Sequence, residues 1–178
     1  MRTTLFAVAA ALTLAACADL PLSGPSATAE LKPLKGSGVT GTVNFTQKGS
    51  KVLVVASVKG LSPGLHGFHV HEKGDCSAPD GTSAGGHFNP HGKKHGGPHD
   101  AERHGGDLGN LNADASGNAK LTLEVDGLSI GSGPANIIGR SVIVHADPDD
   151  YKTQPTGNSG GRLACGVIVA AGGSRSGY

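Results

Sequence analysis

The sequence predicts an all-β fold, an antiparallel domain in which short strands are joined by glycine-rich loops. The first reason is alternation, because several runs of residues change between apolar and polar at every position, as strands with one buried face do. The second is composition, because a chain with 30 glycines, no tryptophan and four phenylalanines makes a poor helical bundle. The third is that no stretch of useful length has the apolar period of an amphipathic helix.

The expected strands follow one another along the chain. Three segments alternate with period two, at residues 39–45, 51–59 and 119–125. Two further segments are short runs of β-branched side chains, at residues 141–146 and 165–170. Turn signals stand at residues 60–64 (GLSPG) and 126–127 (DG). Two long loops remain, at about residues 72–110 and 147–162.

The N-terminal segment predicts export. Residues 1–16 have a basic start at Arg2, an apolar stretch and a small-residue end, as a secretory signal peptide does, and they are too short for a stable membrane span. They end in Leu-Ala-Ala-Cys, which resembles the bacterial lipobox and predicts that Cys17 is acylated. Ordinary cleavage after Ala18 is the alternative. We expect a flexible tether at residues 17–32, one domain at 33–172 and a flexible tail at 173–178.

The location expected from this leader is the periplasm or cell envelope, with membrane contact only through lipid on Cys17. Three cysteines leave one odd thiol in an exported protein. If Cys17 is lipidated or removed, Cys76 and Cys165 remain to form a disulfide in an oxidising compartment, the alternative being two buried free thiols. The formal net charge of +1 gives no global argument for nucleic-acid binding.

Histidine is concentrated in one region. Eight of the nine histidines lie between residues 66 and 104, and imidazole is the commonest protein ligand for zinc and copper. His69 and His71 are two apart, so on a strand they point to the same face, and His145 ends another strand-like run. The long loop adds further donors: His87, His91, His95, His99, His104 and Asp107.

Glycine and proline throughout that loop forbid a regular helix, so loop conformation must gather these ligands. Three histidines with one aspartate are a zinc-like set, whereas an all-imidazole set suits copper. Two neighbouring metals are therefore plausible, but spacing alone does not divide the residues between them. The alternative is a solvated, histidine-biased loop that binds metal only loosely.

Three motifs, in this order, resemble the copper/zinc superoxide dismutase family of the bacterial, exported type. They are residues 67–72 (GFHVHE), residues 86–110 (GHFNP, then His95, His104 and GDLGN) and residues 161–167 (GRLACGV). The resemblance covers about residues 27–169. It implies an antiparallel Greek-key β-barrel or sandwich of immunoglobulin-like architecture, in which the two long loops carry the function.

The same resemblance implies the ligand sets and the cofactors. Copper, cycling between Cu(II) and Cu(I), takes His69, His71, His87 and His145. Zn(II) takes His87, His95, His104 and Asp107, with one ion of each metal per subunit. His87 then bridges the two ions and exchanges a proton as copper is reduced and reoxidised, while zinc holds the loop.

Two more residues receive roles from the resemblance. Arg162 lies beside copper and attracts the superoxide anion, the alternative being an ordinary surface arginine. Asp149 links a copper histidine to a zinc histidine, the alternative being an acidic loop residue. His66 is expected to be structural or partly exposed. His91 and His99 are expected to be solvated or to capture metal before delivery, and neither is predicted as a ligand.

The predicted function is dismutation of superoxide to dioxygen and hydrogen peroxide in the bacterial cell envelope. A protein of another class, which buffers or delivers copper or zinc without turnover, is the alternative. Such a protein needs the histidines but neither Arg162 nor the bridge. The resemblance leaves open a monomer or a homodimer, and the leader does not say which membrane receives the lipid.

Overall fold

A computed structural model describes residues 24–172 of the chain. The predicted signal peptide, the lipobox cysteine Cys17 and the tail at residues 173–178 lie outside the described residues. Eight strands make up the fold: β1 (Ser26–Pro33), β2 (Thr40–Lys48), β3 (Lys51–Lys59), β4 (Gly64–His71), β5 (Asp107–Ala113), β6 (Asn118–Val125), β7 (Ser141–His145) and β8 (Arg162–Ala170). The only helical element among the described residues is a single 3-10 turn, Thr82–Ala84.

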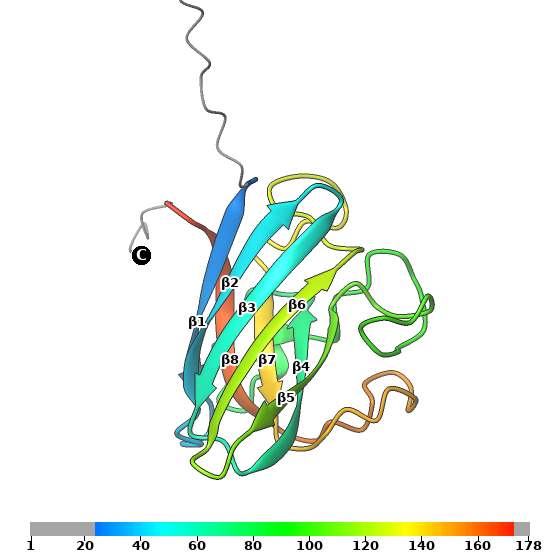
Figure 1. Ribbon diagram of the computed structural model, residues 1–178. Helices are drawn as coiled ribbons and strands as arrows, with labels where there is room; N and C mark the ends of the chain where they lie inside the picture. Colours follow the sequence, from blue (N-terminus) through cyan, green and yellow to red (C-terminus); the bar gives the residue numbers. More distant parts are fainter. Residues whose placement is uncertain (1–23, 173–178) are drawn as a thin grey trace, which may run out of the picture.

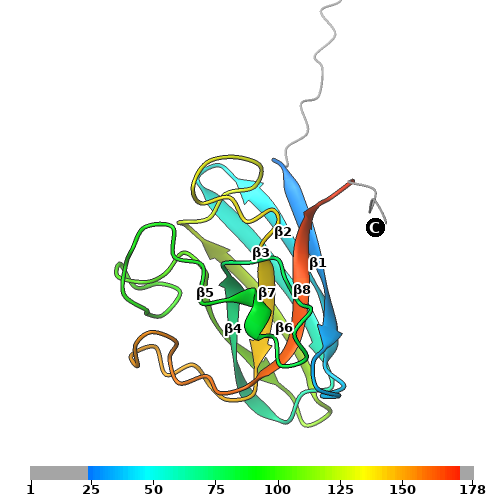
Figure 2. The same cartoon turned by 180° about the vertical axis from the view of Figure 1, so that it is seen from behind.

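The strands close into an antiparallel barrel in the order β1-β2-β3-β6-β5-β4-β7-β8 (Figures 1 and 2). Neighbours in the barrel are not always neighbours in the chain, because β3 pairs with β6 and β4 pairs with β7. These crossovers are of the Greek-key kind. The all-β, antiparallel prediction is therefore confirmed.

The core fills the inside of this barrel. On β3 the side chains of Val52, Val54, Ala56 and Val58 are buried while those between them face outward, which is the period-two pattern that the sequence shows. Phe45 and Phe68 are the largest fully buried side chains. Few aromatic residues are needed, because valine, leucine, isoleucine and alanine supply most of the core cluster.

The largest differences between the structure and the sequence prediction lie at three places. Residues 26–32, predicted as part of a tether, belong to β1, which pairs with β2 and with β8. Their alternating Ala27, Ala29 and Leu31 are buried, but side chains this small among proline, serine and glycine do not stand out as a strand. The predicted first loop likewise ends earlier, because β5 begins at Asp107. A third connection, residues 126–140, was not predicted as a long loop.

The barrel brings the histidine-bearing strands together. β4 lies between β5 and β7, so the strand with His69 and His71 runs beside the strand that ends at His145. The strands β5, β4, β7 and β8 are adjacent in this order. The loop from β4 to β5 and the loop from β7 to β8 therefore connect strands on the same side of the barrel. A disulfide joins Cys76 in the first loop to Cys165 in β8, as the cysteine count predicted.

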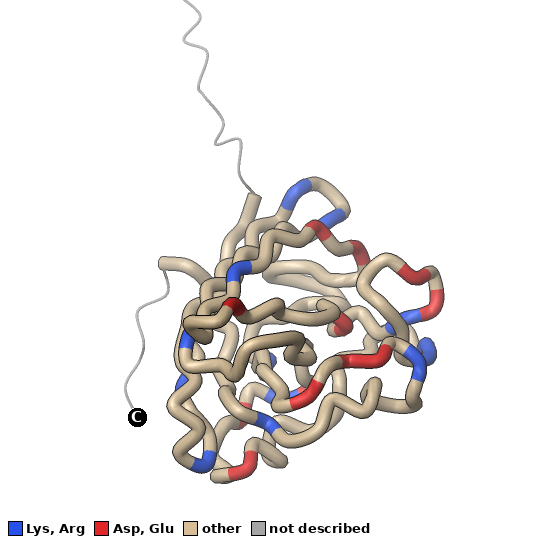
Figure 3. Tube along the Cα trace, turned by 60° about the horizontal axis from the view of Figure 1, so that its bottom comes forward, with Lys and Arg blue, Asp and Glu red and all other residues tan. Residues whose placement is uncertain are grey.

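Charged residues of both signs are spread over the described part of the molecule and are not gathered by sign (Figure 3). Within the described residues, no helix has both the length and the apolar character needed to cross a membrane.

Candidate metal centre

Two clusters of buried ligand-type side chains share one histidine. The first holds His69, His71, His87 and His145, and the second holds His87, His95, His104 and Asp107. Within each cluster, one candidate ligand atom from each residue lies within 4.8 Å of all the others. The structure thus brings together the residues that the sequence resemblance divided between copper and zinc.

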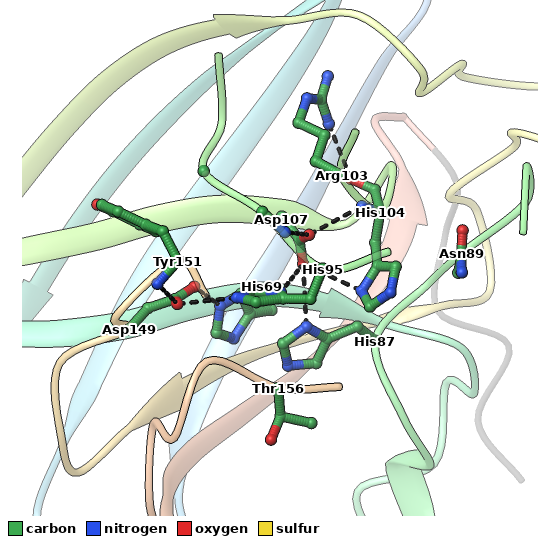
Figure 4. A network of polar contacts seen from close by, with 12 residues as sticks. His69, His87, Asn89, His95, Arg103, His104, Asp107, Asp149, Tyr151 and Thr156 are labelled. Carbon is green, nitrogen blue, oxygen red and sulfur yellow. Dashed lines mark hydrogen bonds and ion pairs between the residues drawn. The ribbon is translucent and has the colours of Figure 1, made fainter. Parts of the chain in front are cut away.

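The second cluster converges on a single carboxylate oxygen. Nδ1 of His87, His95 and His104 lies 2.9, 3.1 and 3.3 Å from Oδ1 of Asp107. The other oxygen of Asp107 accepts hydrogen bonds from the backbone N–H groups of Gly96 and His104, which fixes the carboxylate at the start of β5. Three imidazole nitrogens and one carboxylate oxygen are the donor number and type of a closed zinc site (Figure 4).

Buried nitrogen atoms without hydrogen-bond partners show that these donors fit bound metal. Among the described residues, Nδ1 of His69, His95 and His104 and Nε2 of His87 are buried and make no hydrogen bond of good geometry, although Nδ1 of His95 and of His104 faces Oδ1 of Asp107. Leaving buried polar atoms unpaired costs stability, so four of them in one place need a partner of another kind. A metal ion in each cluster would supply it.

The shared histidine offers one ring nitrogen to each cluster. Nδ1 of His87 lies on the Asp107 side, which leaves its unpartnered Nε2 for the first cluster. In the first cluster, Nε2 of His71 lies 3.3 Å from Nε2 of His145. Nδ1 of His71 donates to the carbonyl of Gly85, so its Nε2 carries no proton and is free to bind metal.

Asp149 links the two clusters, because its carboxylate contacts one histidine of each. One of its oxygens lies 2.7 Å from Nε2 of His69 and the other 2.9 Å from Nε2 of His95. Each ring donates its Nε2–H to this carboxylate, so that Nδ1 is the nitrogen each ring presents to a metal. Asn110 holds Asp149 in turn, by donating to its carbonyl and accepting from its backbone N–H.

The electrostatics of the first cluster keep its rings neutral. Burial lowers the pKa of all four: His69, His71, His87 (to about 4) and His145. Positive charge on a neighbouring ring lowers the pKa of His71, His87 and His145 further. Only a neutral imidazole binds a metal, so the cluster is held in its binding form at neutral pH.

The carboxylates of the site are held ionised. Burial alone would raise the pKa of Asp107 and of Asp149, but hydrogen bonds from histidine rings outweigh it and lower both pKa values. For His95, burial would lower the pKa, but the bonds to Asp107 and Asp149 outweigh burial and raise it to about 9. Without zinc, His95 is therefore protonated at pH 7.

Arg162 is fixed beside the first cluster by two backbone carbonyls. Its Nη1 donates to Gly81 at 2.6 Å and its Nη2 donates to Gly85 at 2.7 Å. The Gly85 carbonyl also accepts from His71, so one peptide group touches both side chains. Burial lowers the pKa of Arg162 below its usual value, but an arginine keeps its charge throughout the neutral range.

Comparison with known proteins identifies the family. The model of the family described as copper/zinc superoxide dismutase (SODC) matches residues 39–168. A curated relative, superoxide dismutase [Cu-Zn] 2 of Brassica juncea, is 50% identical over 138 residues, which cover 74% of this chain and 90% of the relative. The chain belongs to the copper/zinc superoxide dismutase family.

This membership makes the chain a superoxide dismutase of the copper/zinc type, and it agrees with the two buried histidine-rich sites. The relative just named comes from a plant. The bacterial, exported subtype that the motifs suggested therefore stays a prediction, and so does the assignment of each ligand set to its metal.

Three histidines lie outside both clusters of this dismutase. His66 is buried and bonds to backbone carbonyls at both ring nitrogens, through Nδ1 to His145 and through Nε2 to Ser62, both at 2.9 Å. It is thus placed as a structural residue rather than a ligand. His91 and His99 are exposed on the first loop.

Several supporting residues were not predicted from the sequence. Asn110 lies in the same GDLGN motif as the predicted ligand Asp107, and that position is the signal in the sequence that marks it. Gln154 bonds to the backbone of His95, and no sequence pattern marks it. Arg103 is buried beside His104 and pairs with Asp126, which ties the first loop to the connection after β6.

Proposed function

We propose that this dismutase works in the bacterial cell envelope, anchored by lipid on Cys17, where it removes extracytoplasmic superoxide. The leader at residues 1–16 with its Leu-Ala-Ala-Cys end supports export and lipidation. The disulfide between Cys76 and Cys165 supports an oxidising compartment, because such bonds are rare in the cytosol.

The observation that carries the catalytic assignment is the shared position of His87 between two buried clusters, with Arg162 fixed beside the first. His69, His71, His87 and His145 would hold a copper ion, which would supply the one-electron chemistry that oxidises one superoxide to dioxygen and, with two protons, reduces the next to hydrogen peroxide. Zinc held by the other set has no redox chemistry and stabilises the loop.

The side chains of the chain itself do the remaining work. The guanidinium of Arg162 attracts and orients the anion, and its two backbone bonds to Gly81 and Gly85 keep it aimed while it does so. Nε2 of His87, which makes no hydrogen bond among the described residues, takes up and releases a proton, while Nδ1 of the same ring lies against Asp107. Asp149 keeps His69 and His95 in the tautomer that each metal needs.

The activity assignment is tested by loading the mature protein with one copper and one zinc and following the loss of superoxide. We expect His69→Ala to remove copper and turnover together. His99→Ala is the matched control, because His99 is an exposed loop histidine outside both clusters, and it should keep both. If the unchanged protein binds both metals tightly but does not accelerate the loss of superoxide, the dismutase activity is refuted. The alternative, a protein that buffers or delivers metal, is then favoured.

The location is tested separately by mass spectrometry of the mature N-terminus and by fractionation of cells. The proposal expects a diacylglycerol-modified Cys17 and protein in the membrane fraction, and it expects Cys17→Ser to release the protein. A mature chain that begins after residue 18 and carries no lipid refutes the anchor, while leaving export intact.

A further inference from the structure

We infer that Gln154 is a positioning residue for the zinc site, because its side-chain amide holds the backbone of the ligand His95 from the opposite loop. The inference rests on the zinc assignment and not on the proposed location. It goes beyond the two clusters, since Gln154 contacts none of their ligand atoms.

The contact is reciprocal. The backbone N–H of His95 donates to Oε1 of Gln154 at 2.9 Å, and Nε2 of Gln154 donates to the carbonyl of His95 at 2.9 Å. One side chain thereby satisfies both backbone polar groups of a buried loop residue that belongs to no strand. Such groups otherwise need water or another segment of the protein.

The amide is carried by a turn that is held together from within. Asp150 accepts hydrogen bonds from the backbone of Lys152 and Thr153 through one oxygen and from the hydroxyl of Thr153 through the other. The Thr153 carbonyl accepts from the N–H of Gly157 at 2.7 Å. These bonds fix the backbone of the turn that carries Gln154. Its two hydrogen bonds can therefore restrain the position of His95.

The same loop holds His95 at a second point. Asp149 accepts the Nε2–H of its ring, and the Nδ1 of the ring faces Asp107. With Gln154 removed, the ring keeps this carboxylate but the backbone behind the ring loses its only direct partners among the described residues. Because outer partners of metal ligands set ligand orientation, we expect about tenfold weaker zinc retention.

The experiment uses fully metallated protein and two readouts besides activity. Zinc release to a chromogenic chelator gives the rate of zinc loss, and the visible spectrum after Co²⁺ replaces zinc reports the ligand geometry. We expect Gln154→Ala to release zinc about tenfold faster and to alter the Co²⁺ bands. Gln154→Glu should do the same despite its similar size, because it places a carboxylate against the His95 carbonyl.

Lys152→Gln is the matched control, because it changes an exposed side chain on the same turn and leaves the backbone contacts in place. It should retain zinc like the unchanged protein, and its metal-free form should unfold at the same temperature as the metal-free unchanged protein. Equal zinc release and identical Co²⁺ spectra for Gln154→Ala and the unchanged protein overturn the inference. Failure of the unchanged protein to bind zinc overturns the zinc assignment itself.

Discussion

The disulfide should contribute a large share of the stability of the metal-free protein, and the double variant Cys76→Ala, Cys165→Ala tests this. The bond joins residues 89 positions apart and ties the first loop to β8. Cys165 is buried in a small cluster with Leu34, Ala84 and Ile143, against which Cys76 packs. Alanine at both positions removes the crosslink with little other change.

The expected loss follows from the length of the closed loop. Removing a crosslink across 89 residues restores unfolded-chain entropy worth about 4.6 kcal/mol at 25 °C in the chain-entropy model. For a domain of this size, each kcal/mol shifts the unfolding midpoint by about 2–4 °C. The double variant should therefore unfold about 9–18 °C below the unchanged protein.

The assay is thermal unfolding of metal-free protein, monitored by calorimetry with and without a thiol reductant. Reductant should lower the midpoint of the unchanged protein toward that of the double variant, and it should leave the double variant itself unmoved. A double variant as stable as the oxidised protein, or a reductant effect on a chain without these cysteines, would refute the entropic reasoning.

Three further outcomes are expected. Arg162→Gln should slow superoxide loss and weaken its dependence on ionic strength, because the anion then meets no fixed charge beside the first cluster; stopped-flow rates over a salt series measure both. Gly157→Ala should weaken zinc and lower the unfolding midpoint, because its Cβ would lie within contact of Asp149 and 2.6 Å from Nε2 of His95, at a φ of +65°. Gly161→Ala is its control, since a Cβ there meets nothing within 4 Å. The metal-free protein should lose stability as the pH rises from about 6.5 to about 9, because the protonated His95 is held by carboxylates only when folded.

The sign of this pH effect separates His95 from its neighbours. Its pKa is raised by folding, so its contribution is complete below pH 6.5 and is lost through about pH 9. The first cluster has lowered pKa values, so His71 and His145 weaken the fold only as the pH falls below 6.5. A thermal unfolding midpoint of the metal-free protein that stays level or rises between pH 6.5 and 9 would contradict the raised pKa of His95. For the other two predictions, a salt dependence of the Arg162→Gln rate equal to that of the unchanged protein would contradict the first. Zinc retention by Gly157→Ala equal to that of the unchanged protein would contradict the second.

The strands that alternate clearly could be predicted from sequence, and so could the ligand types. β3 was predicted with its observed bounds, because every second residue from Val52 to Val58 is apolar and buried. His69 and His71 were placed on one strand face by their spacing alone. The division of ligands between two metals came from family motifs, because loop residues such as His95 and His104 reach their positions through turns that have no period.

Other features depend on contacts between distant segments and leave no local pattern. β1 was predicted as tether because small residues fill its buried positions, and only its pairing with β2 and β8 makes it a strand. Gln154 lies 59 residues from His95, and a glutamine in a polar loop gives no sign of such a partner. Asp149 was found only by resemblance, for the same reason.

The register of β1 against β8 also sets which end of the barrel the proposed lipid anchor would join. Ala27 pairs with Ala170, while Pro33 pairs with Ala164, so the first residues of β1 and the start of β8 at Arg162 lie at opposite ends of the barrel. A strand of eight residues is about 26 Å long. If Cys17 carries the proposed lipid, the chain would enter the barrel from the membrane side at the end that lies opposite Arg162.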